Sequence, residues 1–190
     1  MAIVDIYNNT GAIDRTSGIK EVIKLIPNLA SLECLDLFAG DGSFCSYILA
    51  QNTKNITCIA YNSEDAKSIQ KNIPSANIIV TDALNATNFI NPLDLVFCDN
   101  PQGILPNGTC EYFDYLKKVI PYIKSGGYLL HNINVNPYNY DKNGEWAKRR
   151  NDFYQKSSCE NLDLDFVKQY HQNYIESKFN RKIKKIQFIP

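Results

Sequence analysis

Acidic residues follow short apolar runs at three places along the chain. Asp36, Asp82 and Asp99 each stand just after or at the end of such a run, and Tyr61 closes another. A carboxylate accepts hydrogen bonds from ammonium, amino and hydroxyl groups. Ligands of open α/β sheets bind outside the carboxyl ends of the strands. We therefore expect these residues to line one edge of a sheet and to bind a polar ligand there.

The first acidic residue leads into a glycine turn, Ala39-Gly40-Asp41-Gly42, and then into a helical pattern. Glycine has no Cβ, so it adopts positive φ and lets a ligand approach the backbone closely. The start of the following helix offers free N–H groups. The turn is either part of a binding site or only a tight connection between strand and helix, and the motif alone leaves both open.

Residues 36–42, Asp-Leu-Phe-Ala-Gly-Asp-Gly, resemble the first motif of class I S-adenosylmethionine-dependent methyltransferases, with Phe38 in place of the first glycine. The resemblance implies that Gly40 and Gly42 lie along the methionine part of the cofactor, and that Asp36 contacts its ammonium group directly or through water. It also implies that the adenine ring is held by Asp82 and by the backbone of the next residue. The expected cofactor is S-adenosylmethionine, and the expected binding residues are Asp36, Phe38, Gly40, Gly42, Tyr61, Asp82 and Ala83.

One position departs from this family pattern. An acidic residue usually closes the second strand and holds the ribose hydroxyls, but the run 56–59 places Ala60 there. Asn62 and Glu64 are the expected substitutes. A missing charged hydrogen bond costs roughly 1.5 to 3 kcal/mol, so weak cofactor binding or a different ligand is an alternative.

A second motif, Asp99-Asn100-Pro101-Gln102, resembles the fourth motif of amino-methylating members of the family. That resemblance implies that Asp99, Asn100 and the Pro101 carbonyl are the catalytic residues and orient a nitrogen acceptor. The acceptor that it favours is a nitrogen of a nucleic acid base. Gln102 and Gly103 replace the second proline and the aromatic ring of the motif, so stacking of a flipped base has no support at this position. The alternative is a simple turn at the end of a strand.

Two histidines and two basic clusters are further candidates. His131 is either a general base or a structural residue, and we expect His171 to be structural. The clusters lie at 148–150 and 181–185, and each is either a contact with RNA or DNA or a solvated face. The formal net charge is +0 and the sequence pI is about 6.7, so the whole chain is not an electrostatic trap for nucleic acid.

The 6 cysteines include no Cys-x-x-Cys pair and have no histidine at metal-ligand spacing. We therefore expect no metal site, buried free thiols and a reduced, cytoplasmic setting. No run of about 18 to 20 apolar residues is long enough to span a membrane, so a soluble protein without a membrane partner is expected.

The 190 residues predict one α/β domain over 1–190, with a doubly wound, seven-stranded, mostly parallel sheet and helices on both faces. Residues 1–17 are rich in turn formers and are either a lid, over Tyr7–Thr16, or a mobile N-terminal segment. The family resemblance implies an antiparallel terminal strand. The expected strands are 34–38, 56–61, 77–80, 93–98, 128–133, 164–170 and 182–188, and the expected helices are 19–26, 43–50, 63–72, 111–123 and 145–155.

The function that these features favour is a S-adenosylmethionine-dependent methyltransferase. Two alternatives remain open: a methyltransferase of a small molecule or protein, and a methyltransferase-like binding or scaffold protein without turnover. A nicotinamide-dependent dehydrogenase has less support, because the turn lacks the third glycine of Gly-x-Gly-x-x-Gly. The acceptor and the oligomeric state are not set by the sequence.

Overall fold

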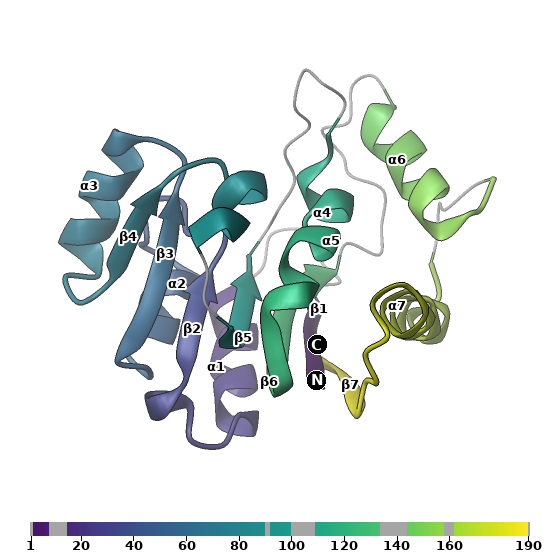
Figure 1. Ribbon diagram of the computed structural model, residues 1–190, viewed down its shortest axis with the longest axis horizontal. Coiled ribbons are helices and arrows are strands. Elements are labelled where there is room, and N and C mark those ends of the chain that lie inside the picture. The colour runs from purple at the N-terminus through teal and green to yellow at the C-terminus, as the bar shows by residue number, and fades with distance from the viewer. Residues whose placement is uncertain are drawn as a thin grey trace.

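The computed structural model describes residues 2–7, 15–89, 92–99, 109–133, 144–157 and 162–189. Within them, one sheet runs through the molecule in the order β4-β3-β2-β5-β6-β1-β7 (Figure 1). Every strand pairing among these residues is parallel. The strands are β1 Ala2–Tyr7, β2 Glu33–Asp36, β3 Asn55–Ala60, β4 Asn77–Val80, β5 Leu93–Cys98, β6 Ile123–Ile133 and β7 Lys185–Ile189.

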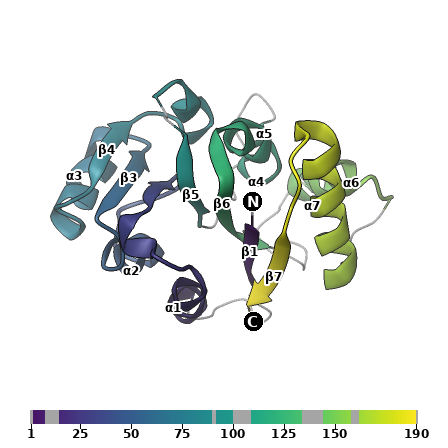
Figure 2. The same cartoon turned by 60° about the horizontal axis from the view of Figure 1, so that its bottom comes forward.

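Helices cover both faces of the sheet, as Figure 2 shows with α1 and α2 on one side and α5 and α7 on the other. The described α-helices are α1 Arg15–Leu25, α2 Cys45–Ala50, α3 Ser63–Asn72, α4 Glu111–Asp114, α5 Leu116–Val119, α6 Glu145–Tyr154 and α7 Leu164–Phe179. Short 3-10 helices lie at Leu29–Ser31, Ala83–Phe89 and Ile120–Tyr122. The α/β fold with a parallel sheet and helices on both faces is therefore confirmed.

Alternation along the central strands divides the core into two layers. In β5, Leu95 and Phe97 pack with the side that carries α1, α2 and α3, whereas Val96 and Cys98 pack with α5 and α7. Both faces are apolar because a parallel sheet is buried on both sides. Five described cysteines, at positions 34, 45, 58, 98 and 110, are free and buried, as expected of small core residues.

The N-terminal residues form a strand, which corrects the expectation of a lid or a mobile segment for Ala2–Tyr7. β1 lies between β6 and β7, with Ala2 opposite Tyr128 and opposite Lys185. Three β-branched residues, Ile3, Val4 and Ile6, were the overlooked signal. The remaining lid residues 8–14 lie outside the described residues, and α1 begins at Arg15.

The chain between 162 and 180 is a helix, so the expected strand at 164–170 is wrong. The Asp163 carboxylate caps α7 by accepting hydrogen bonds from the N–H groups of Asp165 and Phe166, at 3.4 and 3.3 Å. Val167, His171 and Ile175 are buried at a spacing of four residues, which is a helical period. Periodicity thus outweighs the β-forming residue types in this segment.

The terminal strand β7 pairs parallel with β1 (Ala2 opposite Lys185), so the antiparallel terminal strand is also wrong. Its direction follows from α7, because a helix that connects strands of one sheet returns the chain to the edge where the first strand began. The place beside β6, where the family resemblance put an antiparallel strand, is taken by β1.

The Gly126-Gly127 pair is part of β6. The pairing of β5 with β6 shifts register between Leu93 and Leu95, which is a bulge. Gly127 fits there because a Cβ would lie 2.8 Å from the Asp94 carbonyl oxygen, and Gly126 has a φ of +85°. The expected helix 111–123 is divided into α4, α5 and a 3-10 turn that contains Pro121.

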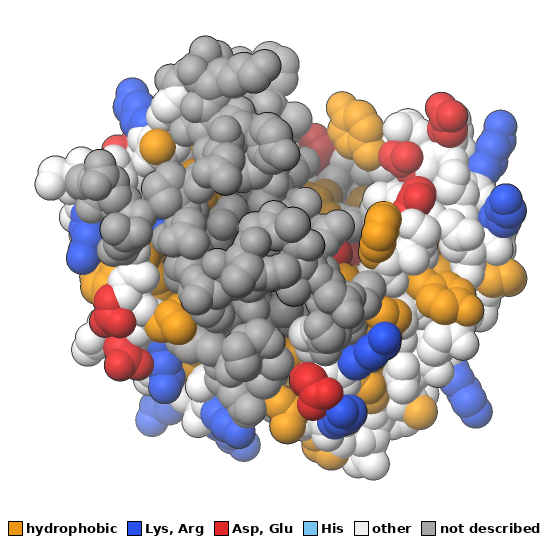
Figure 3. All heavy atoms as spheres, turned by 180° about the vertical axis from the view of Figure 1, so that it is seen from behind, with side chains coloured by type: hydrophobic (Ala, Val, Ile, Leu, Met, Phe, Trp, Pro, Cys, Tyr) orange, Lys and Arg blue, Asp and Glu red, His pale blue; other side chains and the backbone are white. Residues whose placement is uncertain are grey.

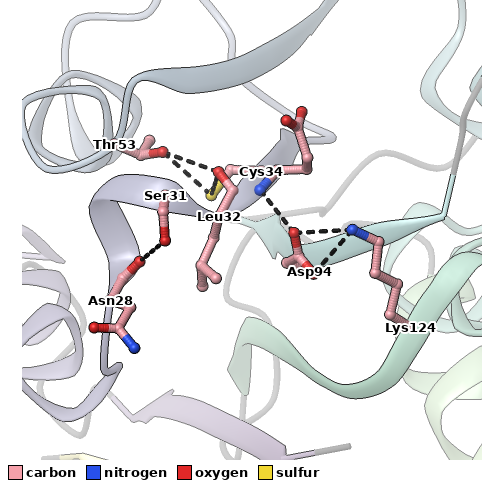
Figure 4. Close-up of polar contacts among 8 residues, drawn as sticks. Asn28, Ser31, Leu32, Cys34, Thr53, Asp94 and Lys124 are labelled. Atoms are coloured by element: carbon pink, nitrogen blue, oxygen red, sulfur yellow. Dashed lines mark hydrogen bonds and ion pairs between the residues drawn. The ribbon is translucent and has the colours of Figure 1, made fainter.

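Asp94 joins three strands near their amino ends (Figure 4). Its Oδ2 accepts hydrogen bonds from the Glu33 N–H of β2 and from Lys124 Nζ of β6, both at 3.0 Å. Nearby, Thr53 donates to the Leu32 carbonyl oxygen at 3.2 Å. These contacts fix the register of β2, β5 and β6, which carry the predicted site residues at their opposite ends.

Candidate functional site

A cavity of ≈ 380 Å³ opens at the carboxyl ends of β2, β3, β4 and β5. Figure 3 shows hydrophobic and acidic side chains around a hollow on the side of the molecule that carries α3 and β4. The volume lies in the range of sites for small molecules and cofactors. Five of the predicted site residues line the cavity: Phe38, Gly40, Tyr61, Ala83 and Asp99.

Asp36 lies behind this cavity rather than in its lining, at the end of β2, and is fully buried. Its Oδ1 accepts a hydrogen bond from the Phe38 N–H at 3.3 Å. Its Oδ2 is buried without a hydrogen-bond partner among the described residues. Burial, joined by the negative charge of Asp99, raises the pKa of Asp36 to about 7, against a hydrogen bond from Ser46 that lowers it.

The two glycines of the turn have different surroundings. Gly40 lines the cavity, has a φ of +56°, and has no atom within 4 Å of the place where a Cβ would stand. Gly42 has a φ of +77°, and a Cβ there would lie 3.2 Å from the Ile69 Cα of α3. Gly40 thus leaves room for a ligand, whereas Gly42 lets α3 pack against the turn.

The side chain of Asp82 accepts a hydrogen bond from within its own loop. Its Oδ1 accepts a hydrogen bond from the Leu84 N–H at 2.8 Å, and its carbonyl oxygen accepts one from the Asn85 N–H at 2.9 Å. The neighbours Thr81 and Ala83 line the cavity. The role predicted for Asp82 toward an adenine amino group stays a prediction.

The predicted acceptor motif is described only at its first residue. Asp99 is 9% exposed and lines the cavity. Asn100 and Pro101 lie outside the described residues. The motif is therefore placed at the cavity by Asp99 alone.

Eight residues that the sequence reasoning did not assign to the site also line the cavity: Leu37, Ala39, Asp41, Phe44, Ser46, Ile59, Asp65 and Thr81. Phe44 and Tyr47 are 57% and 44% exposed. The buried face of α2 is formed instead by Cys45, Ser46 and Leu49. Lining residues such as Asp41 and Thr81 stand just after a glycine or the end of a strand. This position was the available signal, because such residues face the ligand-binding edge of an α/β sheet.

The charge of the cavity lining is one-sided. Asp41, Asp65 and Asp99 contribute carboxylates, and no Lys or Arg is among the described lining residues. Such a cavity favours a ligand with positive charge or hydrogen-bond donors and opposes a pyrophosphate. The electrostatics therefore disfavour a nicotinamide dinucleotide.

The three arginines of the two basic clusters make contacts inside the protein, whereas the lysines of these clusters are exposed. Arg149 forms an ion pair with Asp114 at 2.6 Å. Arg150 is 2% exposed and lies over the Trp146 ring, 5.7 Å from its centroid. Arg181 donates to the carbonyl oxygens of Ile123 and Pro121. These arginines are therefore not displayed as a nucleic-acid surface.

His131 is buried and does not line the cavity. It stacks on His171, with ring centroids 5.3 Å apart, and contacts Tyr115 edge-on at 6.0 Å. Tyr115 in turn contacts Phe38 of the cavity wall, with centroids 6.0 Å apart. This position supports the structural interpretation of both histidines rather than a general base.

The described part of the chain has no group of three or more His, Cys, Asp and Glu side chains that could hold a metal ion. None of its described helices combines the length and the hydropathy needed to cross a membrane.

Comparison with known proteins gives likeness at the level of structure. No family model matches the sequence, and no curated protein matches it. A candidate methyltransferase from Bacillus halodurans is 16% identical with a TM-score of 0.56, over 85% of this chain and 68% of that one. TehB from Haemophilus influenzae is 17% identical with a TM-score of 0.52, over 74% of this chain and 51% of that one. TrmN from Thermus thermophilus is 15% identical with a TM-score of 0.48, over 60% of this chain and 37% of that one.

The chain thus spans about half of TehB and little more than a third of TrmN. The first two likenesses show that it has the fold of class I methyltransferases. This fold has a ligand site at the carboxyl ends of its strands, where the acid-lined cavity lies.

Proposed function

We propose that the protein is a S-adenosylmethionine-dependent methyltransferase that acts on a nitrogen acceptor. The observation that carries the proposal is the cavity at the carboxyl ends of β2 to β5, which has three carboxylates and no described cation in its lining. In a class I methyltransferase fold, that place and that charge suit a ligand with an ammonium and a sulfonium group.

The residues present fit this cofactor. The buried Oδ2 of Asp36, which has no partner among the described residues, suits an ammonium group reached directly or through water. Gly40 leaves space beside the turn, and Tyr61 and Ala83 line the wall where a flat ring would lie. Phe38 packs edge-on against Tyr115, which fixes the floor of the cavity. When bound, the cofactor supplies an activated methyl group.

The chain's own contribution to transfer is positioning. Asp99 lines the cavity and its carboxylate would accept a hydrogen bond from an amino group. With Asn100 and the Pro101 carbonyl, it would orient the nitrogen lone pair toward the methyl group. We propose a nucleic acid base as the acceptor, on the resemblance of this motif to amino-methylating enzymes.

A small-molecule acceptor is the second candidate, because of how the basic residues are used. Arg149, Arg150 and Arg181 make internal contacts, so the phosphate contacts that dominate nucleic-acid affinity would rest on the exposed lysines of these clusters. A gel-shift titration with RNA and DNA at rising salt separates the candidates. A shift that weakens steeply with salt supports the nucleic acid, and a flat response at low salt supports the small molecule.

Calorimetric titration with S-adenosylhomocysteine tests the cofactor, with NAD⁺ as the anionic comparison. We expect binding at roughly micromolar concentration, about 8 kcal/mol, and none of NAD⁺. Asp36→Ala should weaken the binding while the protein stays folded. No binding at millimolar ligand would overturn the proposal. Binding together with no methyl transfer to any acceptor in a radiolabel screen would support a scaffold without turnover.

A further inference from the structure

The end of β3 carries no group that could hold a ribose. Ala60 is the last residue of the strand, is 1% exposed, and packs in the core with α1, α2 and α3. Its methyl group accepts no hydrogen bond. If the cavity binds an adenosine-containing ligand, another residue must receive the ribose hydroxyls.

The two substitutes that the sequence suggested are not available. The Asn62 side-chain oxygen caps α3 by accepting hydrogen bonds from the N–H groups of Glu64 and Asp65, at 2.8 and 2.9 Å. Glu64 is exposed and is not part of the cavity lining. A capping oxygen that leaves its helix costs about 1 kcal/mol, so Asn62 is held in its structural role.

Asp65 is a residue at the cavity that could receive the ribose hydroxyls. It lines the cavity together with Tyr61 and Thr81, which follow the ends of β3 and β4. No hydrogen bond or ion pair within the described part of the chain engages its carboxylate. The carboxylate of Asp41, by contrast, accepts hydrogen bonds from the N–H and hydroxyl of Ser43, at 2.9 and 2.7 Å.

The position of Asp65 is fixed by the glycine turn. Gly42 lets Ile69 of α3 approach the turn closely, and Asn72 Nδ2 donates to the Asp41 carbonyl oxygen at 2.9 Å. These two contacts lock α3 against the turn that bounds the same cavity. The helix that carries Asp65 is therefore packed against the turn that contains Gly40.

We infer that Asp65 receives the two ribose hydroxyls of the adenosine-containing ligand, in place of an acid at the end of β3. The inference rests on the proposed function, since it names a binding residue of the same site. A carboxylate has two oxygens, and each can accept one of the two neighbouring hydroxyls. Asp65 is a residue of ligand specificity, because it distinguishes ligands with a ribose from ligands without its hydroxyls.

Calorimetry of the full chain with S-adenosylhomocysteine and with its 2′,3′-dideoxy analogue tests the inference. Asp65→Asn should weaken binding of the first ligand roughly tenfold to a hundredfold, the effect of losing a charged hydrogen bond. It should change binding of the dideoxy analogue by no more than about twofold. Glu64→Gln is the matched control, one residue away on the same turn and outside the cavity lining, and should bind both ligands as the wild type does.

The outcomes separate this inference from the function on which it rests. A wild-type chain that does not bind S-adenosylhomocysteine overturns the proposed function and the role of Asp65 with it. If the wild type binds, and Asp65→Asn either keeps wild-type affinity for both ligands or weakens both equally, only the role of Asp65 is overturned. Circular dichroism of Asp65→Asn verifies that α3 is retained.

Discussion

Asp36 and Asp99 lie at the ends of neighbouring parallel strands, and the charge of Asp99 adds to burial in raising the pKa of Asp36. Asp36 pairs in register with Phe97, two residues before Asp99. Two carboxyl groups near one another, one of them fully buried, destabilise a fold unless a ligand or a proton compensates. The cationic ligand that we propose would compensate these charges.

Asp36→Asn should stabilise the ligand-free protein at pH 8. The pKa of Asp36 is about 7 in the folded state and 3.8 without burial, so between these values the folded chain keeps a proton that the unfolded chain releases. Stability therefore falls as pH rises from 4 to 7. The asparagine does not titrate, and the gain at pH 8 is up to about 4 kcal/mol, at about 1.4 kcal/mol per pKa unit.

Urea unfolding at pH 4.5 and pH 8 measures this gain, which should nearly disappear at the lower pH. Asp41→Asn is the control, because its hydrogen bonds from Ser43 lower the pKa of Asp41 and the substitution should not stabilise at pH 8. An Asp36→Asn protein that is equally destabilised at both pH values would show that the Asp36 carboxyl is not the titrating group.

Gly42→Ala should destabilise the protein more than Gly40→Ala. Both residues have positive φ, at +77° and +56°, but a Cβ at position 42 also lies 3.2 Å from the Ile69 Cα. We expect about 1 kcal/mol for the backbone strain alone and about 1 to 3 kcal/mol more for overpacking at position 42. Thermal unfolding of the two variants compares them directly.

The effects of the two substitutions on ligand affinity should have the opposite order to their effects on stability. Gly40 lines the cavity and Gly42 does not, so a Cβ at position 40 stands where a ligand would lie. Gly40→Ala should weaken binding of S-adenosylhomocysteine more than Gly42→Ala, measured at a temperature where both variants are folded. Equal affinity of Gly40→Ala and wild type would place the ligand away from the turn.

His171→Phe should reduce the sensitivity of the protein to acid. Burial, with a smaller contribution from His131, holds the pKa of His171 well below its usual value of 6.5. Below pH 6.5 the unfolded chain takes up a proton that the folded chain does not, so stability falls with pH by about 1.4 kcal/mol per unit. Phenylalanine removes this proton and keeps an aromatic ring beside Tyr154 and Phe153.

Tyr154→Phe is the matched control for this change. It removes the same hydrogen bond, Tyr154 OH to His171 Nε2 at 3.2 Å, but leaves the histidine in place. For each protein, the measurement is the difference between the free energies of unfolding at pH 7.5 and pH 5. This difference should be the same in Tyr154→Phe as in the wild type, and smaller in His171→Phe. Identical pH dependence of the two variants would contradict a titrating role for His171.

Asp94→Ala should destabilise the amino end of the sheet more than Asp94→Asn. The alanine leaves the Glu33 N–H without its acceptor, at a cost of about 1 to 3 kcal/mol. The asparagine keeps an acceptor and loses only the ion pair with Lys124, whose side chain is 41% exposed, so less than about 1 kcal/mol is expected.

The pH dependence of the stability difference between the wild type and Asp94→Asn tests the direction of the pKa shift of Asp94. Burial raises the pKa of Asp94, but the Glu33 N–H and Lys124 together hold it below its usual value. Its stabilisation is thus present above pH 3.8 and is lost as pH falls through the lower folded value. Urea unfolding should show the wild type more stable than Asp94→Asn at pH 7, with the difference shrinking as the pH falls below 3.8.

The strands that form the cavity edge were predictable from local sequence. The expected strands 34–38, 56–61, 77–80 and 93–98 correspond to β2 to β5, and residues at and after their ends lie around the cavity. The expected helix 63–72 also agrees with α3, which Asn62 caps. Short-range signals suffice here because each run is rich in apolar residues and ends in a turn.

The far side of the sheet was not predictable in the same way. Ala2–Tyr7 becomes a strand only by pairing with β6 and β7, which are distant in the sequence. Residues 164–170 include residue types that favour strands, yet they form part of α7 because one helical face of the segment is buried. Such choices depend on which neighbour is available, and propensity alone does not contain that information.

The sequence by itself determined the alternating α/β order, the glycine turn and the acids at the strand ends, because these depend on residue type and local spacing. Only the tertiary structure decided that Asp36 lies behind the cavity, that Gly42 serves the packing of α3, and that Asp65 faces the site while Asn62 caps its helix. The reason is physical: burial, close approach and the sharing of one cavity arise between segments that are separate in the chain, after the sheet has brought them together.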